Sequence, residues 1–95
     1  LARLAGRYQY VNIKLDKAGG LTEALHMVAE ARRLGLGTMV GCNCGTSLAM
    51  ASAFVLATQC DLVDLDGPFH LVDDRIPAMR YEGSRLTAPD RALWG

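Results

Sequence analysis

The stretch YQYVNIKL, from Tyr8 to Leu15, decides the fold of this chain. Val11, Ile13 and Leu15 alternate with polar residues, a period of two that predicts a β-strand with two distinct faces. A glycine pair at 19–20 then interrupts the pattern, so the strand is expected to end before it.

Two helical stretches and two more apolar runs follow this strand. From Leu21 to Leu34 apolar residues recur with a helical period, and Gly35 is a natural stop. Thr38–Cys42 is predicted to be the second strand, and Cys60–Leu65 the third. Strands that alternate with helices indicate an α/β fold with parallel pairing.

The second helix is expected to start after a loop at 42–45 and to continue to about Thr58. Either Thr46 or Ser47 can cap its first turn. The tail from Phe69 to Gly95 has no sustained period and is read as a covering segment, with a short hairpin around 82–83. Two neighbouring carboxylates in it, Asp73 and Asp74, are expected to be solvated.

Composition narrows the classes of function. Ten basic residues balance ten acidic ones among the 95, which removes the electrostatic case for nucleic acid or for an anionic membrane surface. The longest apolar run is too short to span a bilayer. Three cysteines at irregular spacing indicate reduced thiols, and therefore a cytoplasmic protein. The absence of an initiator Met at Leu1 suggests that the chain is a piece of a longer one.

Lys14 is the first candidate for chemistry. It lies near the carboxyl end of the predicted first strand, where parallel α/β folds build their active sites. A lysine beside a pocket of low polarity can act as a base. The other reading is a solvated lysine at the rim of a strand, and position alone favours it.

Asp64 and Asp66 form the second candidate. Their spacing of two places both carboxylates on one face of the third strand, among apolar neighbours. Two such carboxylates repel each other unless a cation lies near them, which could be a metal, a lysine or a substrate ammonium. A solvated strand end is an equally good explanation of this pair.

Cys42 and Cys44 are the third candidate. With Cys60, His26 or His70 they could bind zinc, but the spacing matches no zinc module. A small residue at a strand end, with its loop facing a pocket, is the preferred reading of Cys42.

Three motifs, in this order and at these separations, resemble the dipeptide epimerases of the enolase superfamily, in its muconate-lactonizing branch. They are VNIKLDKAGGL at Val11–Leu21, VGC with GTSLAMA at Val40–Ala51, and VDLDGP at Val63–Pro68. The resemblance implies the C-terminal part of a (β/α) TIM-like barrel, about strands six to eight with their helices and closing tail, across residues 1–95. The earlier strands and the N-terminal capping domain would then lie outside the chain.

The resemblance also implies roles for the candidates. Lys14 would be one of two lysines on opposite faces of the substrate α-carbon. Asp64 and Asp66 would hold the α-ammonium of a dipeptide, and Cys42 and Cys44 would contact the substrate. The family uses Mg²⁺, with ligands on strands that this chain lacks, so no metal ligand is assigned within it. A small-molecule substrate and a homo-oligomeric full-length enzyme are expected, with the 95 residues inactive alone.

Two other interpretations remain open. One is another enolase-superfamily racemase, dehydratase or cycloisomerase with the same lysine, although those substrates often lack an ammonium for Asp64 and Asp66. The other is a non-catalytic small α/β domain that binds a partner through its open sheet edge.

Overall fold

A parallel sheet of three strands organises the chain. The computed structural model describes all residues, 1–95. Its strands are β1 (Tyr10–Ile13), β2 (Gly37–Val40) and β3 (Leu62–Val63), in the spatial order β1-β2-β3. Both pairings are parallel. The prediction of an α/β fold with parallel pairing is confirmed, although β1 and β3 are shorter than the apolar runs that predicted them.

The helices follow the strands in the predicted order. They are α1 (Leu15–Ala18), α2 (Leu21–Arg33) and α3 (Ser47–Ala57), followed by the 3₁₀ turn η1 (Gly67–His70). The tail contains the expected hairpin, formed by β4 (Tyr81–Glu82) and β5 (Arg85–Leu86). Helix α2 matches its prediction to within one residue at its end.

The short helix α1 was not predicted, and it is the reason that β1 ends early. The carbonyl of Lys14 accepts hydrogen bonds from the N–H groups of Lys17 and Ala18, at 3.0 and 2.9 Å. Gly19 closes the turn with φ of 96°, a left-handed conformation that favours glycine. The strand period therefore stops at Ile13, one residue before Lys14.

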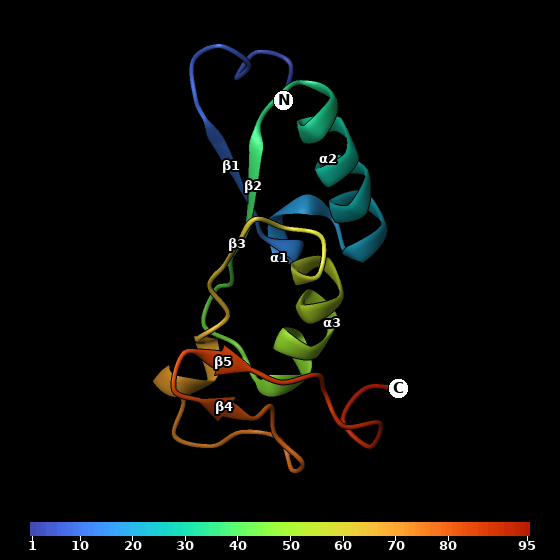
Figure 1. Cartoon of the computed structure of the whole chain (residues 1–95). Helices are drawn as coiled ribbons and strands as arrows, with labels where there is room; N and C mark the ends of the chain where they lie inside the picture. The colour runs from blue at the N-terminus through green and yellow to red at the C-terminus, as the bar shows by residue number, and fades with distance from the viewer.

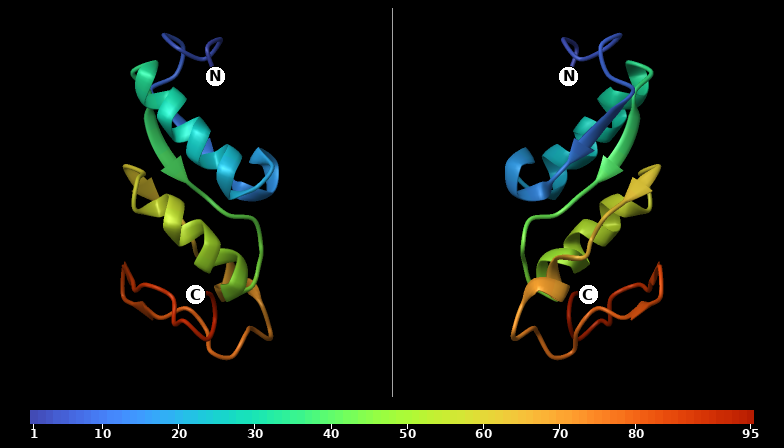
Figure 2. Two further views of the ribbon diagram at one scale, coloured as in Figure 1. Left: turned by 90° about the vertical axis from the view of Figure 1, so that its right-hand side faces the viewer. Right: turned by 90° about the vertical axis from the view of Figure 1, so that its left-hand side faces the viewer.

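Helices α2 and α3 cover one face of the sheet (Figures 1 and 2). Ile13, Thr38 and Val40 point toward that face and are almost completely buried, whereas Tyr10 and Asn12 are exposed. Only 16 of the 95 residues are buried, because the core is a single layer between helices and sheet. Because β1 is buried on one face and exposed on the other, its apolar and polar residues alternate along the strand.

Two glycines of the second strand region let side chains of β1 approach the backbone closely on the open face. A Cβ at Gly37 would collide with the Tyr10 ring, and one at Gly41 would come within 2.6 Å of Asn12 Oδ1. Both positions therefore need glycine for close approach, not for an unusual backbone.

The tail is fastened to the start of α3 by Asp74. Its carboxylate accepts hydrogen bonds from the Ser47 N–H, at 2.7 Å, and from the Ser47 hydroxyl, while Ser47 Oγ accepts the N–H of Met79 at 2.9 Å. Thr46 occupies the N-cap position but makes no side-chain capping bond. The expectation that Thr46 or Ser47 caps the helix with its own side chain, and that Asp74 is solvated, was therefore wrong. A carboxylate from the tail caps the helix instead. Its negative charge also offsets the positive end of the helix dipole, which a serine or threonine hydroxyl cannot do.

We expect Asp74→Ala to lower the free energy of unfolding by about 1–3 kcal/mol, because it leaves polar groups of the fully buried Ser47 without a partner. Urea denaturation measures this. Asp73→Ala is the matched control, since the adjacent Asp73 is exposed. Equal stability of the two variants would contradict the capping role.

The same contact should make stability depend on pH. Partial burial raises the pKa of Asp74, but hydrogen bonds from Ser47 and Arg75 outweigh it and leave that pKa below its ordinary value. A lowered carboxyl pKa contributes stability at neutral pH that is lost as the pH falls through the folded-state pKa. The stability difference between the protein and its Asp74→Asn variant should therefore be full at pH 7 and shrink below about pH 4. A difference that stays constant from pH 7 to pH 3 would refute this.

Candidate functional site

The candidate residues lie at the carboxyl ends of the three parallel strands, which meet at one edge of the sheet. Lys14 directly follows β1, and the loop Gly41–Gly45 follows β2. Asp64 and Asp66 come just after β3 instead of within it. The Asp64 N–H still donates to the Val40 carbonyl at 2.9 Å, so pairing with the β2 strand continues one residue past β3.

Lys14 is half-buried and lies against the loop that follows β2. Its Nζ donates a hydrogen bond to Asn43 Oδ1 at 3.3 Å. The amide nitrogen of Asn43 in turn donates to Asp16 Oδ2 at 3.1 Å. The solvated-rim interpretation of Lys14 therefore does not describe it fully, because two further polar side chains are arranged around its amine.

Cys42 connects the same loop to the third strand region. Its Sγ lies 3.9 Å from Asp66 Oδ1. Burial raises the pKa of the Cys42 thiol, and the negative charges of Asp66 and Asp64 raise it further, against partial opposition from backbone N–H groups at Gly67 and Asp66. Cys42 is therefore a neutral thiol at pH 7 and acts here as a hydrogen-bond donor. Cys44 is exposed, and of the two cysteines only Cys42 forms a hydrogen bond to a carboxylate.

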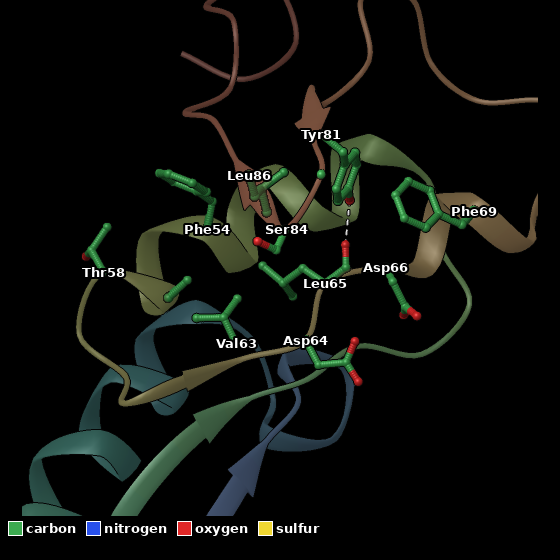
Figure 3. Close-up of a pocket in the computed structure, with 12 residues that line it drawn as sticks. Phe54, Thr58, Val63, Asp64, Leu65, Asp66, Phe69, Tyr81, Ser84 and Leu86 are labelled. Atoms are coloured by element: carbon green, nitrogen blue, oxygen red, sulfur yellow. Dashed lines mark hydrogen bonds between the residues drawn. The ribbon is translucent and has the colours of Figure 1, made fainter.

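The carboxylates of Asp64 and Asp66 point to the same side of their segment, as their spacing predicted (Figure 3). Both side chains are exposed, and Asp66 Oδ2 lies 3.6 Å from His70 Nε2. The Leu65 carbonyl between them accepts a hydrogen bond from the Tyr81 hydroxyl. Burial, together with nearby negative charge, raises the pKa of Tyr81 to about 12, so this hydroxyl stays protonated and keeps donating.

Gly67 brings the loop and the carboxylate segment into contact. A Cβ at this position would lie 2.9 Å from the Asn43 carbonyl oxygen and 3.2 Å from Gly45 N. Any larger residue would push the two segments apart. The loop after β2 is thus held between Lys14 on one side and the Asp66–Gly67 turn on the other.

A hollow of about 460 Å³ lies between α3, the segment after β3 and the hairpin. Its lining is mostly apolar and includes Phe54, Val63 and Leu86. The carboxylates of Asp64 and Asp66 point away from these three side chains (Figure 3). Asp64 and Asp66 nevertheless belong to the lining of the hollow, so the hollow and the two carboxylates adjoin the same short segment after β3.

The chain does not assemble a metal site from its own side chains. Nowhere do three or more His, Cys, Asp or Glu residues come close enough to hold a metal ion. The three cysteines are free thiols. No helix is long and apolar enough to span a bilayer.

Several residues of this edge were not found from the sequence. Asn43 and Asp16 contact the lysine or its partner, His70 contacts Asp66, and Tyr81 fixes the segment between the carboxylates. His70 follows Asp66 by four residues, a spacing that could have predicted their contact across one turn. No local signal identified Tyr81, which reaches the site from the tail.

This arrangement defines a class of protein. A parallel sheet with helices between its strands, and with polar side chains gathered at its carboxyl edge, is how α/β enzymes build an active site.

Comparison with known proteins narrows the class. No family model matches the chain. It is 47% identical over 95 residues to an N-acetyl-D-glutamate racemase of a Pseudoalteromonas species, covering all of this chain and 30% of that protein. It is 49% identical over 86 residues to the L-Ala-D/L-Glu epimerase of Escherichia coli, covering 90% of this chain and 27% of that protein.

Solved structures agree. An enolase family member from Agrobacterium tumefaciens with homology to dipeptide epimerases matches all of this chain with a TM-score of 0.95 and 56% identity, over 29% of its own length. That structure holds sodium and L-Ala-L-Glu. A dipeptide epimerase from Methylococcus capsulatus, in complex with Mg and L-Arg-D-Lys, matches 79% of the chain with a TM-score of 0.72 and 35% identity, over 22% of its own length.

The chain is thus homologous to a segment of the dipeptide epimerases of the enolase superfamily, and the resemblance of its motifs is confirmed. It spans between a quarter and a third of the length of the curated relatives named above.

Proposed function

We propose that residues 1–95 form the C-terminal part of a (β/α) barrel, about strands six to eight with their helices and closing tail. The observation behind this is a sheet with β1 and β3 at its edges and with one uncovered face. A closed barrel pairs every strand on both sides and fills its interior with side chains. The capping domain and the earlier strands would belong to the rest of the full-length protein.

Within that protein, we propose the activity of a dipeptide epimerase, an isomerase that inverts an α-carbon. The observation that carries this proposal is the gathering of Lys14, Asp64 and Asp66 at one sheet edge in a chain 49% identical to an L-Ala-D/L-Glu epimerase. The substrate would be a small molecule, a dipeptide or an amino-acid derivative. Cys42 and Cys44 would contact the substrate, with the neutral Cys42 thiol as a hydrogen-bond donor.

Lys14 would move the proton on one face of the α-carbon. As the free amine it takes the α-proton, so that the C–H electrons pass to the adjacent carbonyl and form an enolate. A second base outside these 95 residues would return a proton from the opposite face. As an ammonium, Lys14 performs the same exchange in the reverse direction.

Asp64 and Asp66 would bind the α-ammonium of the substrate. Their carboxylates point to the same side of the segment, and neither forms an ion pair with a lysine or arginine, so a cation beside them would relieve their repulsion. His70, 3.6 Å from Asp66, is the one side chain that approaches them with a possible positive charge.

Magnesium does not fit the residues of this chain, since no three potential ligands lie together. We propose that the full-length protein binds it through side chains outside residues 1–95, and that the isolated 95 residues are inactive. The full-length protein is further proposed to be a cytoplasmic homo-oligomer.

A second candidate is racemization of an N-acylated amino acid, favoured by 47% identity to an N-acetyl-D-glutamate racemase over the whole chain. Such a substrate has an amide in place of the α-ammonium. The two candidates therefore differ in what Asp64 and Asp66 would contact.

In the full-length protein, Lys14→Ala should abolish α-proton exchange with D₂O for one epimer of the Ala-Glu dipeptide, with a loss of at least about 100-fold. Exchange for the other epimer should continue, because the opposite base is intact. NMR of the α-proton follows both reactions. Lys17→Ala, an exposed lysine three residues away, is the control. Exchange of both epimers by the Lys14→Ala variant would overturn the role of Lys14.

Asp64→Asn and Asp66→Asn should each raise KM for L-Ala-L-Glu by roughly 10- to 100-fold, with a smaller change in kcat, because a charge-assisted contact to the ammonium is lost. Initial rates measure this, with Asp73→Asn as the control. KM for N-acetylglutamate should not change in the same way. Unchanged KM for the dipeptide, with an efficient reaction of N-acetylglutamate, would favour the second candidate.

A further inference from the structure

The side chain of Asn43 lies between two charged groups of the first strand region. Lys14 Nζ donates to its Oδ1 at 3.3 Å, and its Nδ2 donates to Asp16 Oδ2 at 3.1 Å. An ammonium only donates and a carboxylate only accepts. One of the two orientations of the amide therefore satisfies both neighbours, and the charges themselves select it.

The backbone of Asn43 is held independently of its side chain. The Asn43 carbonyl packs on Gly67, at a position where a Cβ would be 2.9 Å away. Shortly after it along the chain, Ser47 is fixed by the Asp74 carboxylate. The amide is thus presented to Lys14 from a segment anchored at two places, while Asp16 comes from the helix α1 that begins right after Lys14.

We propose that Asn43 is a positioning residue for Lys14, and that Asp16 orients the Asn43 amide for this purpose. This rests on the proposed function, in which Lys14 exchanges the α-proton. A lysine side chain has several rotatable bonds and loses roughly 1.5–2 kcal/mol of rotamer freedom when fixed. The bond to Asn43 supplies part of that restraint in advance.

The hydrogen-bonding inventory of the amine is compatible with this role. A neutral lysine amine has two N–H groups and one lone pair. One N–H can stay on Asn43 Oδ1 while the lone pair takes the α-proton, so the contact need not break during the transfer. Asn43 therefore acts through Lys14 and on one face of the α-carbon, which separates it from a residue that only shapes the loop.

The test uses the full-length protein and α-proton exchange in D₂O for the two epimers of Ala-Glu. Asn43→Leu should slow exchange on the face served by Lys14 by roughly 10-fold, since small misplacements of reacting groups cost one to two orders of magnitude. Exchange on the opposite face should stay within about 2-fold of the parent rate. Asp16→Ala should produce the same one-sided loss to a smaller extent, and Asp16→Asn, which keeps an acceptor oxygen, should restore it.

Gln59→Leu provides the matched control, an exposed amide at the amino end of β3, away from the site. Thermal unfolding shows which variants are folded. If Asn43→Leu does not fold, the comparison of Asp16→Ala with Asp16→Asn tests the positioning role of Asn43. Equal losses of exchange rate on both faces in Asn43→Leu, or no loss on either face, would overturn the role of Asn43. If Lys14→Ala still loses exchange on one face only, the proposed function stands even then. Exchange on both faces by Lys14→Ala would overturn the proposed function itself.

Discussion

Parallel pairing of β1, β2 and β3 is the constraint on which the rest of the structure depends. Because the three strands run in one direction, their carboxyl ends meet at one edge, and everything polar that follows them gathers there. Lys14, the loop after β2 and the Asp64–Asp66 segment come together for this reason alone. An antiparallel β2 would place its loop at the other edge, beside Asp61 instead of Asp66.

The loop Gly41–Gly45 connects the candidate residues at this edge of the sheet to one another. It contacts Lys14 through Asn43, Asp66 through Cys42 and the η1 turn through Gly67. Its far end runs into Ser47, which is buried and held by a carboxylate from the tail. Hydrogen bonds and one close backbone approach thus join four separate segments.

One face of the sheet is uncovered, which is unusual for parallel strands. Parallel sheets are usually covered on both faces, or closed so that a packed interior replaces the second cover. Here helices cover one face (Figure 2). On the other face, the side chains of Tyr10 and Asn12 pack closely against Gly37 and Gly41. Open edges at β1 and β3 are sites where further strands can pair. Both features agree with a chain that spans under a third of its curated relatives.

The sequence by itself determined the order of strands and helices, the parallel pairing of the strands and the residues near the strand ends. These features depend on the local alternation of apolar and polar residues and on breaks such as Gly19-Gly20 and Gly67-Pro68. The motifs around Lys14 and Asp64 also identified the superfamily. Tertiary structure alone decided which side chains meet. Asn43 with Lys14, Tyr81 with Leu65 and Asp74 with Ser47 are pairs separated by 29, 16 and 27 residues. Contacts across such separations depend on how strands pair and where the tail packs, and no local pattern in the sequence encodes them.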